Sequence, residues 1–597
     1  MKYSNKRLFD FLLNANFNEL PEKFLEFKKE NKWQNYTPIQ FKEKIFELTK
    51  SLLDKEINGN NPDVDQKAKV GLICFSSPDW LVVDLATQMT GAVLVPLYPN
   101  ISETEITAIF NETELEICFV DSLELYEKLK SIQQQTPKLK EIYVMDDASP
   151  DQINWKQLLQ PCTDDVAQEI IKHSEQVASN DVCTIIYTSG TTGWPKGVML
   201  SHKNILSNIE ATSNEIFEEL QLKENKSLSF LPLNHIYEKM ILYTYIYNAF
   251  TISFAESIDQ VANNLKEVKP YVFCAVPRLL EKVYEKIISA GEAQKGFKRN
   301  LFFWAVKLAN QFDYDKKFSF SYKLQLWLAD ALIYKKWRAA IGGNVQTIVI
   351  GGGACQERLV RIFGAAKINI IEGYGLTETS PVLAFNRVGA IKPGTVGVPL
   401  QSVKIKILED GEICCQGDNV MVGYYKNPEE TSKVIIDGWF HTGDIGEMID
   451  GKYLKITDRK KEMFKTSGGK YVVPQPIENK LKENFLIEQI MIVGDGEKFV
   501  SALIVPNFNG LADWCKKHSV SYNGKEEAIK SEEIQAVYQK TIDKYNPQFN
   551  HVEQIKKFVL LSNEWTVESG ELTPSMKMKR KVILQKYSEE IEKIYNQ

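Results

Sequence analysis

The stretch YTSGTTGWPKG, residues 187–197, completes VCTIIYTSG (182–190), an apolar run with the composition of a buried β-strand. Its glycines are interspersed with hydroxyl side chains, and Lys196 adds a positive charge. A glycine-rich turn after a strand exposes backbone N–H groups that can surround phosphate oxygens, and hydroxyls add further donors. The alternative is a surface turn, but a turn rarely needs so many hydroxyls between glycines. The stretch therefore predicts a strand that ends in a phosphate-binding loop.

This loop matches neither of two common nucleotide-binding signatures. Gly197 follows Lys196, so the hydroxyl that would hold Mg²⁺ in a GxxxxGK[ST] loop is not in its usual place. The loop does not read GxGxxG either, so a dinucleotide fold is not indicated.

Similar apolar runs alternate with helical patterns along the first part of the chain. They lie at 69–76, 91–99, 115–122, 141–147 and 345–353, and the last also ends in a glycine-rich turn. Strands separated by helices imply parallel sheets with crossover connections. Ligands of such sheets bind just beyond the carboxyl ends of the strands. We therefore predict an α/β fold with its site at the two glycine turns.

Length and composition indicate a soluble globular protein of at least two domains. The 597 residues exceed what one hydrophobic core supports, and 44% of them are hydrophobic. A net charge of −6 argues against nucleic acid as a partner. The nine cysteines are scattered without zinc spacing, so we expect no structural metal and a reducing, cytoplasmic location. The sequence shows no signal peptide, and no apolar stretch reaches the ~18 residues of a membrane-spanning helix.

Residues 296–340 have a helical pattern and are rich in aromatic residues and lysine. We expect a pair of helices that pack on the core and leave their lysines in solvent. The alternative is an amphipathic surface that rests on a membrane, which would make the protein peripheral to the inner face of the membrane.

A domain boundary lies near DRKKEMFKTSGGKYVVP (458–474), where charge, glycine and proline concentrate as in a linker or hinge. The residues that follow have the length of a small domain. We therefore predict a large domain over 1–458 and a small α+β domain over 459–597, with the hinge near 458–461.

The complete string at 187–197 resembles the phosphate-binding loop of the adenylate-forming superfamily, which includes acyl-CoA synthetases, luciferases and the adenylation domains of peptide synthetases. Further motifs follow in the order of that family. The strings LPLNHIYEK (231–239) and ESGELTPSMKMKR (568–580) are similar to those of long-chain acyl-CoA synthetases. The resemblance covers roughly residues 20–590. It implies a large N-terminal domain of parallel and mixed sheets sandwiched by helices, and a small mobile C-terminal domain.

The resemblance gives roles to residues of the large domain. His235 lies beside the substrate carboxylate, where an imidazole can donate a hydrogen bond. GGGA (351–354) and EGYGLTETSP (372–381) look like the adenine pocket, and Glu378 is then the Mg²⁺ ligand, since magnesium typically takes one or two carboxylates beside phosphates. The alternatives are a core histidine at 235 and a carboxylate at a helix N-terminus at 378.

In the C-terminal part, Asp444 of GWFHTGDIG (438–446) and Arg459 of DRKKE match the family's ribose contacts, and Lys461 matches its hinge residue. A turn aspartate and solvated linker charges are the alternatives. SGGKY (467–471) resembles the glycine loop that lines the pantetheine tunnel, and a plain turn competes with that interpretation.

The C-terminal lysine motif places the adenylation lysine at Lys577 and an arginine at Arg580. Lys579 is one alternative choice of register away and remains an alternative. Ser569 and Ser575 stand where the family more often has asparagine and threonine, which leaves the chemistry intact.

The resemblance thus implies a ligase that uses ATP and Mg²⁺ to activate a long-chain fatty acid as acyl-AMP and then transfers it to coenzyme A. The catalytic residues implied are Lys577, His235 and Glu378. Those for ATP or AMP are Thr188, Ser189, Gly190, Thr191, Thr192, Gly193, Lys196, Gly353, Tyr374, Gly375, Thr377, Asp444 and Arg459. Those for coenzyme A are Gly468, Gly469 and Lys470, and those for the metal are Thr188 and Glu378.

Two competing functions remain at this point. One is a ligase for an aryl or medium-chain acid, or one that uses a carrier protein as acceptor. The other is a nucleotide-binding protein without catalysis, which the presence of Glu378, Asp444, Arg459 and Lys577 disfavours.

Overall fold

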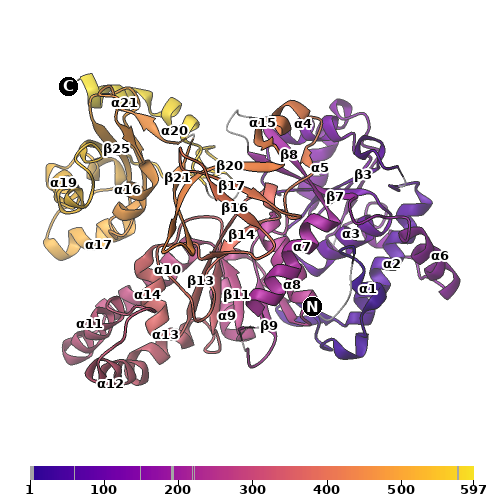
Figure 1. The fold of residues 1–597 in the computed structure, drawn as a ribbon, viewed down its shortest axis with the longest axis horizontal. Helices are drawn as coiled ribbons and strands as arrows, with labels where there is room; N and C mark the ends of the chain where they lie inside the picture. The colour runs from indigo at the N-terminus through magenta and orange to yellow at the C-terminus, as the bar shows by residue number, and fades with distance from the viewer. Residues whose placement is uncertain are drawn as a thin grey trace. The chain divides into compact units, whose positions relative to one another are not determined.

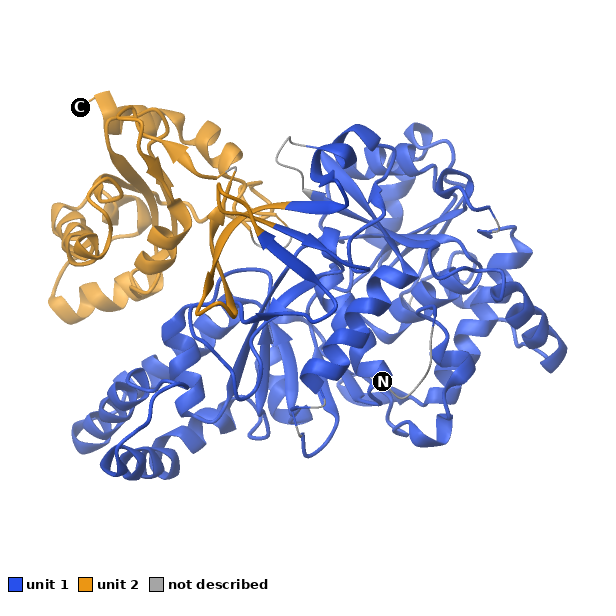
Figure 2. Cartoon of the chain, in the orientation of Figure 1, with its two compact units in different colours: residues 1–406, 414–441 blue, residues 407–413, 442–597 orange. Residues whose placement is uncertain are grey.

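The computed structural model describes all residues except 1–5, 60, 148, 190–193, 218, 221, 461, 574–576 and 597. The chain forms two compact units, which Figure 2 colours separately. Unit 1 comprises residues 1–406 and 414–441, and unit 2 comprises 407–413 and 442–597. The hinge expected near 458–461 stays a prediction, and Lys461 lies outside the described residues.

Unit 1 contains a seven-stranded sheet that holds five of the six predicted strands. Its first four strands in chain order run parallel to their neighbours, and so does β7 to β4, whereas β8 returns antiparallel to β7. The strand order is β18 (Gly423–Tyr424), β8 (Pro195–Ser201), β7 (Val182–Ser189), β4 (Val93–Leu97), β3 (Lys69–Ile73), β5 (Ile117–Val120) and β6 (Glu141–Val144).

A nine-stranded sheet in the same unit holds the sixth predicted strand, β12. Its central strands are parallel, and antiparallel strands lie at both edges. The strand order is β15 (Val398–Pro399), β14 (Val382–Phe385), β13 (Asn369–Gly375), β12 (Thr347–Ile350), β11 (Val272–Ala275), β9 (Lys226–Ser229), β10 (Thr251–Phe254), β1 (Leu25–Lys29) and β2 (Lys32–Tyr36).

Alternate residues of these strands enter different cores. In β12, Val349 faces the core shared by the two sheets, whereas Ile348 and Ile350 face a second core on the other side of the nine-stranded sheet. A strand that is covered on both faces by helices has no solvent-facing side, which is why these runs are mostly apolar and do not alternate with polar residues. The prediction of mixed sheets sandwiched by helices is confirmed.

Helices form three layers around the two sheets. The middle layer includes α3 (Pro78–Met89), α7 (His202–Thr212) and α8 (Ile236–Tyr247), and Figure 1 shows α7 and α8 between the sheets. All twelve residues of α8 are buried, as a helix enclosed on every side requires. α4 (Glu103–Thr113) and α5 (Leu123–Ile132) cover the outer face of the seven-stranded sheet.

The outer face of the nine-stranded sheet carries the predicted helices of residues 296–340. Their inner faces join the second core, so the expected packing is confirmed. This layer contains α9 (Val261–Val268), α10 (Pro277–Glu292), α11 (Gly296–Asn310), α12 (Phe320–Ala329), a π-helical turn (Asp330–Tyr334), α13 (Lys335–Ala340) and α14 (Glu357–Ala365). Among the described residues, no helix of the chain is both long and apolar enough to cross a bilayer.

Unit 2 has its own core and the predicted α+β character. A three-stranded sheet of β24 (Ile487–Val493), β25 (Val500–Pro506) and β26 (Ile555–Leu560) packs with helices from the same unit. These helices are α16 (Pro474–Leu481), α17 (Phe508–His518), α19 (Glu532–Tyr545), α20 (Arg580–Lys586) and α21 (Ser588–Asn596). Two hairpins precede them: β20 (Trp439–Ile449) with β21 (Tyr453–Arg459), and β22 (Phe464–Lys465) with β23 (Tyr471–Val472).

Three strands pass from one unit into the other. They are β16 (Lys404–Ile407), β17 (Glu412–Gln416) and β20, which belong to a five-stranded sheet with β19 (Ile435–Ile436) and β21.

Candidate active site

The glycine-rich loop joins two antiparallel strands at the edge of a parallel region. Thr188 near the end of β7 pairs with Lys196 in β8, and its hydroxyl lies 3.5 Å from the carbonyl oxygen of Lys196. Gly197 is required by packing, because a Cβ there would lie 2.8 Å from Ile185 Cγ2. Ser189 ends β7, whereas Gly190, Thr191, Thr192 and Gly193 fall outside the described residues.

Tyr424 joins two of the predicted site residues. Its hydroxyl donates to Glu378 Oε1 at 2.9 Å, and Lys196 Nζ lies 5.2 Å from the centre of its ring. Strand β18, which carries Tyr424, pairs with β8 directly after Lys196. The amide of Met421 also donates to the carbonyl of Glu378 at 2.8 Å. One strand therefore brings the loop lysine and the carboxylate together.

Lys196 forms an ion pair with Glu430. Glu430 lies in the first turn of α15 (Pro428–Val434), where Asn427 caps the helix. The hydrogen bond from Lys196, followed by one from Lys433, lowers the pKa of Glu430 to about 2. Glu430 thus stays ionised at neutral pH and holds the lysine beside the loop.

Glu378 lies in a single 3-10 turn, Thr377–Thr379, and is not at the start of an α-helix. Thr377 is buried, and Glu378 is half-buried. Tyr374 and Gly375 end β13 with an irregularity in its pairing to β14. A Cβ on Gly375 would lie 1.8 Å from the carbonyl oxygen of Pro381, so glycine is needed there for the approach of the neighbouring strand.

The second glycine turn follows β12 and contains Gly353. Gly352 has a φ of +79°, which favours glycine. The ring of Tyr237 packs on Gly351, where a Cβ would lie 2.9 Å away, and the amide of Cys355 donates to Glu372 at 2.9 Å. Glu372 belongs to β13, so this turn lies beside the strand that leads to Tyr374 and Glu378.

His235 caps the N-terminus of α8 and lies beside this turn. Its Nδ1 accepts from the amide of Tyr237 at 3.1 Å, and the hydroxyl of Tyr237 donates to Val349 at 3.0 Å. An Nδ1 that accepts leaves the proton of the neutral ring on Nε2, which is then a hydrogen-bond donor. His235 is half-buried, and its role beside the substrate carboxylate stays a prediction.

Buried charges anchor the helix that His235 begins. Lys239 Nζ and Asp84 Oδ2 are 2.6 Å apart with both side chains fully buried, and the hydroxyl of Tyr243 donates to the same oxygen at 2.8 Å. Gln88 donates to the other oxygen of Asp84 at 2.8 Å. This network fixes α8 against α3 and so fixes the position of His235.

Unit 2 holds the remaining predicted residues. Asp444 is buried in strand β20, and Arg459 Nε donates to its Oδ1 at 3.1 Å from the paired position in β21. Asp444 is therefore not a turn residue, and the two proposed ribose contacts are adjacent. Gly468, Gly469 and Lys470 form the exposed turn of the β22–β23 hairpin, where Gly469 has a φ of +72°.

Lys577 lies in a short loop before α20 and is exposed. Its amide donates to the hydroxyl of Thr573 at 3.0 Å, and the amide of Thr573 donates to the carbonyl of Lys577 at 2.8 Å. The amide of Lys579 donates to the carbonyl oxygen of Glu571 at 2.7 Å, and the next residue, Arg580, begins α20. The loop backbone is thus held on both sides of the lysine.

The comparison with protein families decides the family of this chain. The profile of the AMP-binding enzyme family matches residues 27–425, and that of the AMP-binding enzyme C-terminal domain matches 462–597. The chain belongs to the AMP-binding enzyme family. Both parts of an AMP-binding enzyme are thus present.

Curated relatives of this AMP-binding enzyme extend over most of its length. It is 32% identical to the long-chain-fatty-acid–CoA ligase FadD15 of Mycobacterium bovis, over 88% of each chain. It is 33% identical to long chain acyl-CoA synthetase 3 of Arabidopsis thaliana, over 88% of this chain and 83% of the relative. The crystal structure of the anthranilate CoA ligase AuaEII has the same fold, with a TM-score of 0.71, 17% identity, and coverage of 98% of this chain and 97% of that one.

The two predicted metal ligands of this AMP-binding enzyme, Glu378 and Thr188, have the donor chemistry that magnesium takes. One carboxylate and the hydroxyl of Thr188 are hard oxygen donors, and magnesium usually takes one or two carboxylates together with substrate phosphates and water. In the described part of the chain, no group of three His, Cys, Asp or Glu side chains could hold a metal. A metal at Glu378 would therefore depend on phosphate oxygens for its other ligands.

Tyr424 and Glu430 of this AMP-binding enzyme were not predicted from the sequence. They lie in GYYKNPEE (423–430), whose Asn-Pro pair signals only the start of a helix. Nothing local indicates that this strand pairs with β8, more than two hundred residues earlier. The contact with Lys196 depends on that pairing.

Proposed function

We propose that this protein is an AMP-forming ligase that activates a long-chain fatty acid with ATP and transfers the acyl group to coenzyme A. The membership of the AMP-binding enzyme family and the names of its relatives over 88% of the chain support this function. The observation that carries the site is the grouping of Lys196, Tyr424 and Glu378 at the glycine-rich loop.

In the first step, an oxygen of the fatty carboxylate attacks the α-phosphorus of ATP. The bond from that phosphorus to the oxygen that bridges the α- and β-phosphates breaks, and pyrophosphate leaves with the electron pair. His235 donates from Nε2 to the carboxylate and orients it, which keeps one oxygen directed at the phosphorus. Lys196 and the amides and hydroxyls of residues 188–193 bind the phosphates.

Negative charge accumulates at the α-phosphate during this step, and donors fixed in place before the reaction usually supply the largest share of the rate enhancement. Thr377 and Lys577 are the proposed donors there. Magnesium, held by Glu378 and Thr188 with the phosphates, would neutralise part of the charge on the leaving pyrophosphate.

In the second step, the thiolate of coenzyme A attacks the acyl carbon, and the bond from that carbon to the AMP oxygen breaks. Asp444 and Arg459 hold the ribose of the adenylate through both steps. Lys577 and the turn at 468–470 serve different steps, so we propose that the C-terminal part turns about residues 458–461 between them. In this scheme the turn admits the pantetheine arm after the lysine has withdrawn.

The enzyme is proposed to work in the cytoplasm and to contact the inner face of the membrane peripherally. A long-chain fatty acid is itself an amphiphile that partitions into bilayers, so such contact would bring the enzyme to its substrate.

Pyrophosphate exchange tests this function. With purified protein, Mg²⁺ and ATP, we expect palmitate to support exchange between pyrophosphate and ATP without coenzyme A, and AMP release once coenzyme A is added. Aryl and medium-chain acids, and a carrier protein in place of coenzyme A, serve as competing substrates. Equal or better rates with any of these would replace the proposed substrate or acceptor, and no exchange with any acid would reject the function.

The substitution Lys577→Ala tests the lysine. Adenylation is expected to fall by about 10²- to 10³-fold, because one donor to the developing charge is lost. Thioester formation from supplied acyl-AMP should stay close to that of the wild type. Lys579→Ala is the matched control, and if it shows the adenylation defect instead, the register of the motif moves by two residues.

A further inference from the structure

Helix α12 is apolar on two opposite faces, of which only one is covered by the described residues. Tyr322, Leu326 and Ala329 pack on the second core of unit 1. Phe320, Leu324, Trp327 and Leu328 follow the spacing of a single helical face and are 83%, 49%, 64% and 40% exposed. Leu332, in the π-helical turn that follows, is 46% exposed. We call these five exposed residues the α12 outer face.

An exposed apolar stripe of this size calls for an occupant, because soluble proteins rarely leave large aromatic and aliphatic side chains together in water. Six of the exposed large hydrophobic residues of the described chain, these five and Phe297 at the start of α11, lie within residues 297–332. Figure 1 shows α11 and α12 side by side as the outermost helices of this part of unit 1.

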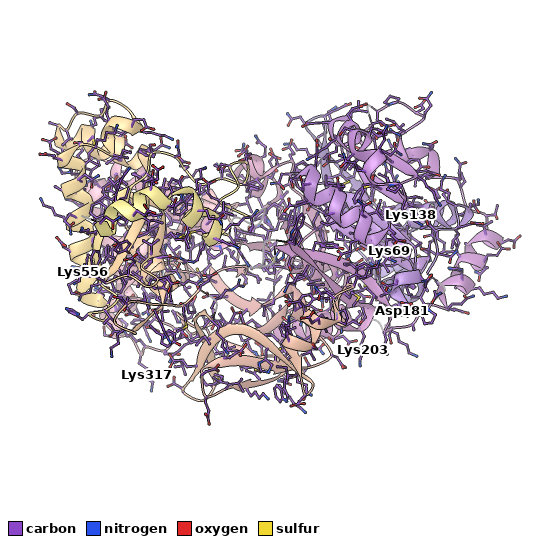
Figure 3. All side chains as sticks on the ribbon, turned by 90° about the horizontal axis from the view of Figure 1, so that it is seen from above. Lys69, Lys138, Asp181, Lys203, Lys317 and Lys556 are labelled. Atoms are coloured by element: carbon purple, nitrogen blue, oxygen red, sulfur yellow. The ribbon has the colours of Figure 1, made fainter. Side chains whose placement is uncertain are left out.

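Positive charge surrounds the α12 outer face. Residues 295–340 contain ten lysines and arginines and three aspartates, a formal charge of +7 in a chain whose net charge is −6. Exposed lysines stand at both ends of α12, at 316, 317, 335 and 336, and Lys323 lies on the helix itself. Lys317 lies at an outer edge of the molecule in Figure 3.

The three aspartates of this segment are already paired. Asp313 lies 2.7 Å from Arg361, Asp315 lies 3.3 Å from Lys392, and Asp330 lies 2.6 Å from both Arg338 and Lys367. These carboxylates therefore do little to offset the exposed lysines, and the segment presents an apolar stripe within a strongly positive field.

We propose that the α12 outer face rests on a bilayer of anionic lipids. The five apolar side chains would enter the interface between headgroups and acyl chains, where Trp is favoured, and the lysines would extend their amines to lipid phosphates. A fluid bilayer accepts a convex helix without a matching groove. A second copy of the chain is a poorer occupant, because its own charge of +7 would be repelled.

This inference specifies the membrane contact of the proposed function, for which it supplies the surface, but its test does not depend on catalysis. The protein would be mixed, without ATP or coenzyme A, with vesicles of phosphatidylcholine alone or with one quarter phosphatidylglycerol, and bound protein measured by sedimentation. We expect binding to the anionic vesicles that weakens with salt, since each lysine near such a surface contributes about fivefold to the affinity.

Two sets of substitutions with matched controls locate the contact. Phe320→Ser, Leu324→Ser and Trp327→Ser together should lower vesicle binding at least about tenfold. Ile39→Ser, Ile258→Ser and Phe485→Ser, which replace apolar residues that are 58%, 72% and 57% exposed elsewhere, should leave it within about twofold. Lys316→Glu with Lys317→Glu should weaken binding more than Lys130→Glu with Lys138→Glu, an exposed pair on another face of the unit.

A milder variant guards against misfolding of α12. Brominated lipids should quench part of the tryptophan fluorescence of the wild type, and Trp327→Phe should abolish that quenching while vesicle binding persists. Equal vesicle binding by the α12 variant and its control would overturn the proposal. So would a concentration-dependent dimer in light scattering that the α12 variant alone abolishes, or vesicle binding that ignores lipid charge.

An outcome that rejects the membrane contact can be distinguished from one that rejects the proposed ligase function. In solution and without vesicles, pyrophosphate exchange with monomeric dodecanoate should be equal in the wild type and the α12 variant. Absence of exchange in both, with dodecanoate and with palmitate, aryl and other medium-chain acids, would reject the ligase and leave the vesicle result unaffected.

Discussion

At the scale of single residues, the hydroxyl of Tyr424 shows how burial sets the direction of a hydrogen bond. Burial, followed by the nearby carboxylate of Glu378, raises the pKa of this hydroxyl well above its usual value. Tyr424 therefore keeps its proton and can only donate to Glu378, which leaves the other carboxylate oxygen directed elsewhere. Glu430, whose lowered pKa keeps it ionised, in turn accepts from Lys196 and holds that side chain in place.

Glu372 provides a test through the dependence of stability on pH. Burial raises its pKa from 4.5 to about 8, although the amide of Cys355 partly opposes the shift. Between these values the unfolded chain has released this proton and the folded chain has kept it. The free energy of unfolding should therefore fall as pH rises from about 4.5 to 8, by up to about 1.4 kcal/mol per pH unit from this group.

Glu372→Gln should flatten this slope, because an amide does not ionise. The measurement is the free energy of unfolding of unit 1 in denaturant at pH 5 and pH 8. Glu127→Gln, at an exposed helical position, is the control and should keep the slope of the wild type. Identical slopes in Glu372→Gln and the wild type would show that Glu372 titrates normally.

At the scale of elements, a charged contact joins α20 to α16 within unit 2. Arg580 Nη2 lies 2.6 Å from both oxygens of Glu478, and its Nε donates to Glu462 at 3.1 Å. Glu478 is buried and also accepts from the amide of Ile492 at 2.8 Å. Since Arg580 directly follows the loop of Lys577, this contact fixes one end of that loop.

Arg580→Met should destabilise unit 2 by about 3–5 kcal/mol, because it leaves Glu478 buried without its partner. Pairing it with Glu478→Met should restore most of that loss, since both charges are then gone. Chemical denaturation of the single and double variants measures this. If the double variant is as unstable as Arg580→Met alone, the loss comes from packing and not from the stranded charge.

The predicted strands illustrate what the sequence determines at this scale. The runs at 69–76 and 345–353 are mostly apolar because both faces of β3 and β12 are buried, so composition alone located them. The inner packing of residues 296–340 followed from helical periodicity in the same way. The pattern could not tell which apolar positions of α12 are exposed, because both faces of the helix are apolar.

Contacts between distant segments escape such analysis. Lys239 lies within a motif that was assigned to His235, yet its charge is neutralised by Asp84, which stands 155 positions earlier. Asp84 lies in α3 and gives no local sign of its partner. The same holds for Tyr424, whose role depends on the pairing of β18 with β8.

At the scale of the whole molecule, each unit has separate cores. The core of unit 2 is built from residues between Val472 and Ile594, and the three cores of unit 1 contain no residue beyond Phe440. Burial of apolar side chains is the main source of folding free energy, so each unit has the means to fold by itself.

A fragment of residues 462–597 should therefore fold cooperatively. We expect a sigmoidal thermal transition by circular dichroism, within a few degrees of one of two transitions in the full chain. A reversed-order fragment of the same composition is the control for residual helix. A broad, non-cooperative change in the fragment would show that this core needs the strands at 407–413 and 442–459.

Three strands, β16, β17 and β20, contain residues of both units. A backbone held in β17 and β20 resists torsion, because twisting it would break several ladder bonds at once. The carbonyl of Ile413 still accepts from the hydroxyl of Thr442 at 2.7 Å just past the crossing. If the C-terminal part turns as proposed under the function, the chain that leaves β21 after Arg459 is where we propose that the turn takes place. Under that proposal, stiffening the connection after Arg459 would hold the enzyme in one of its two half-reactions.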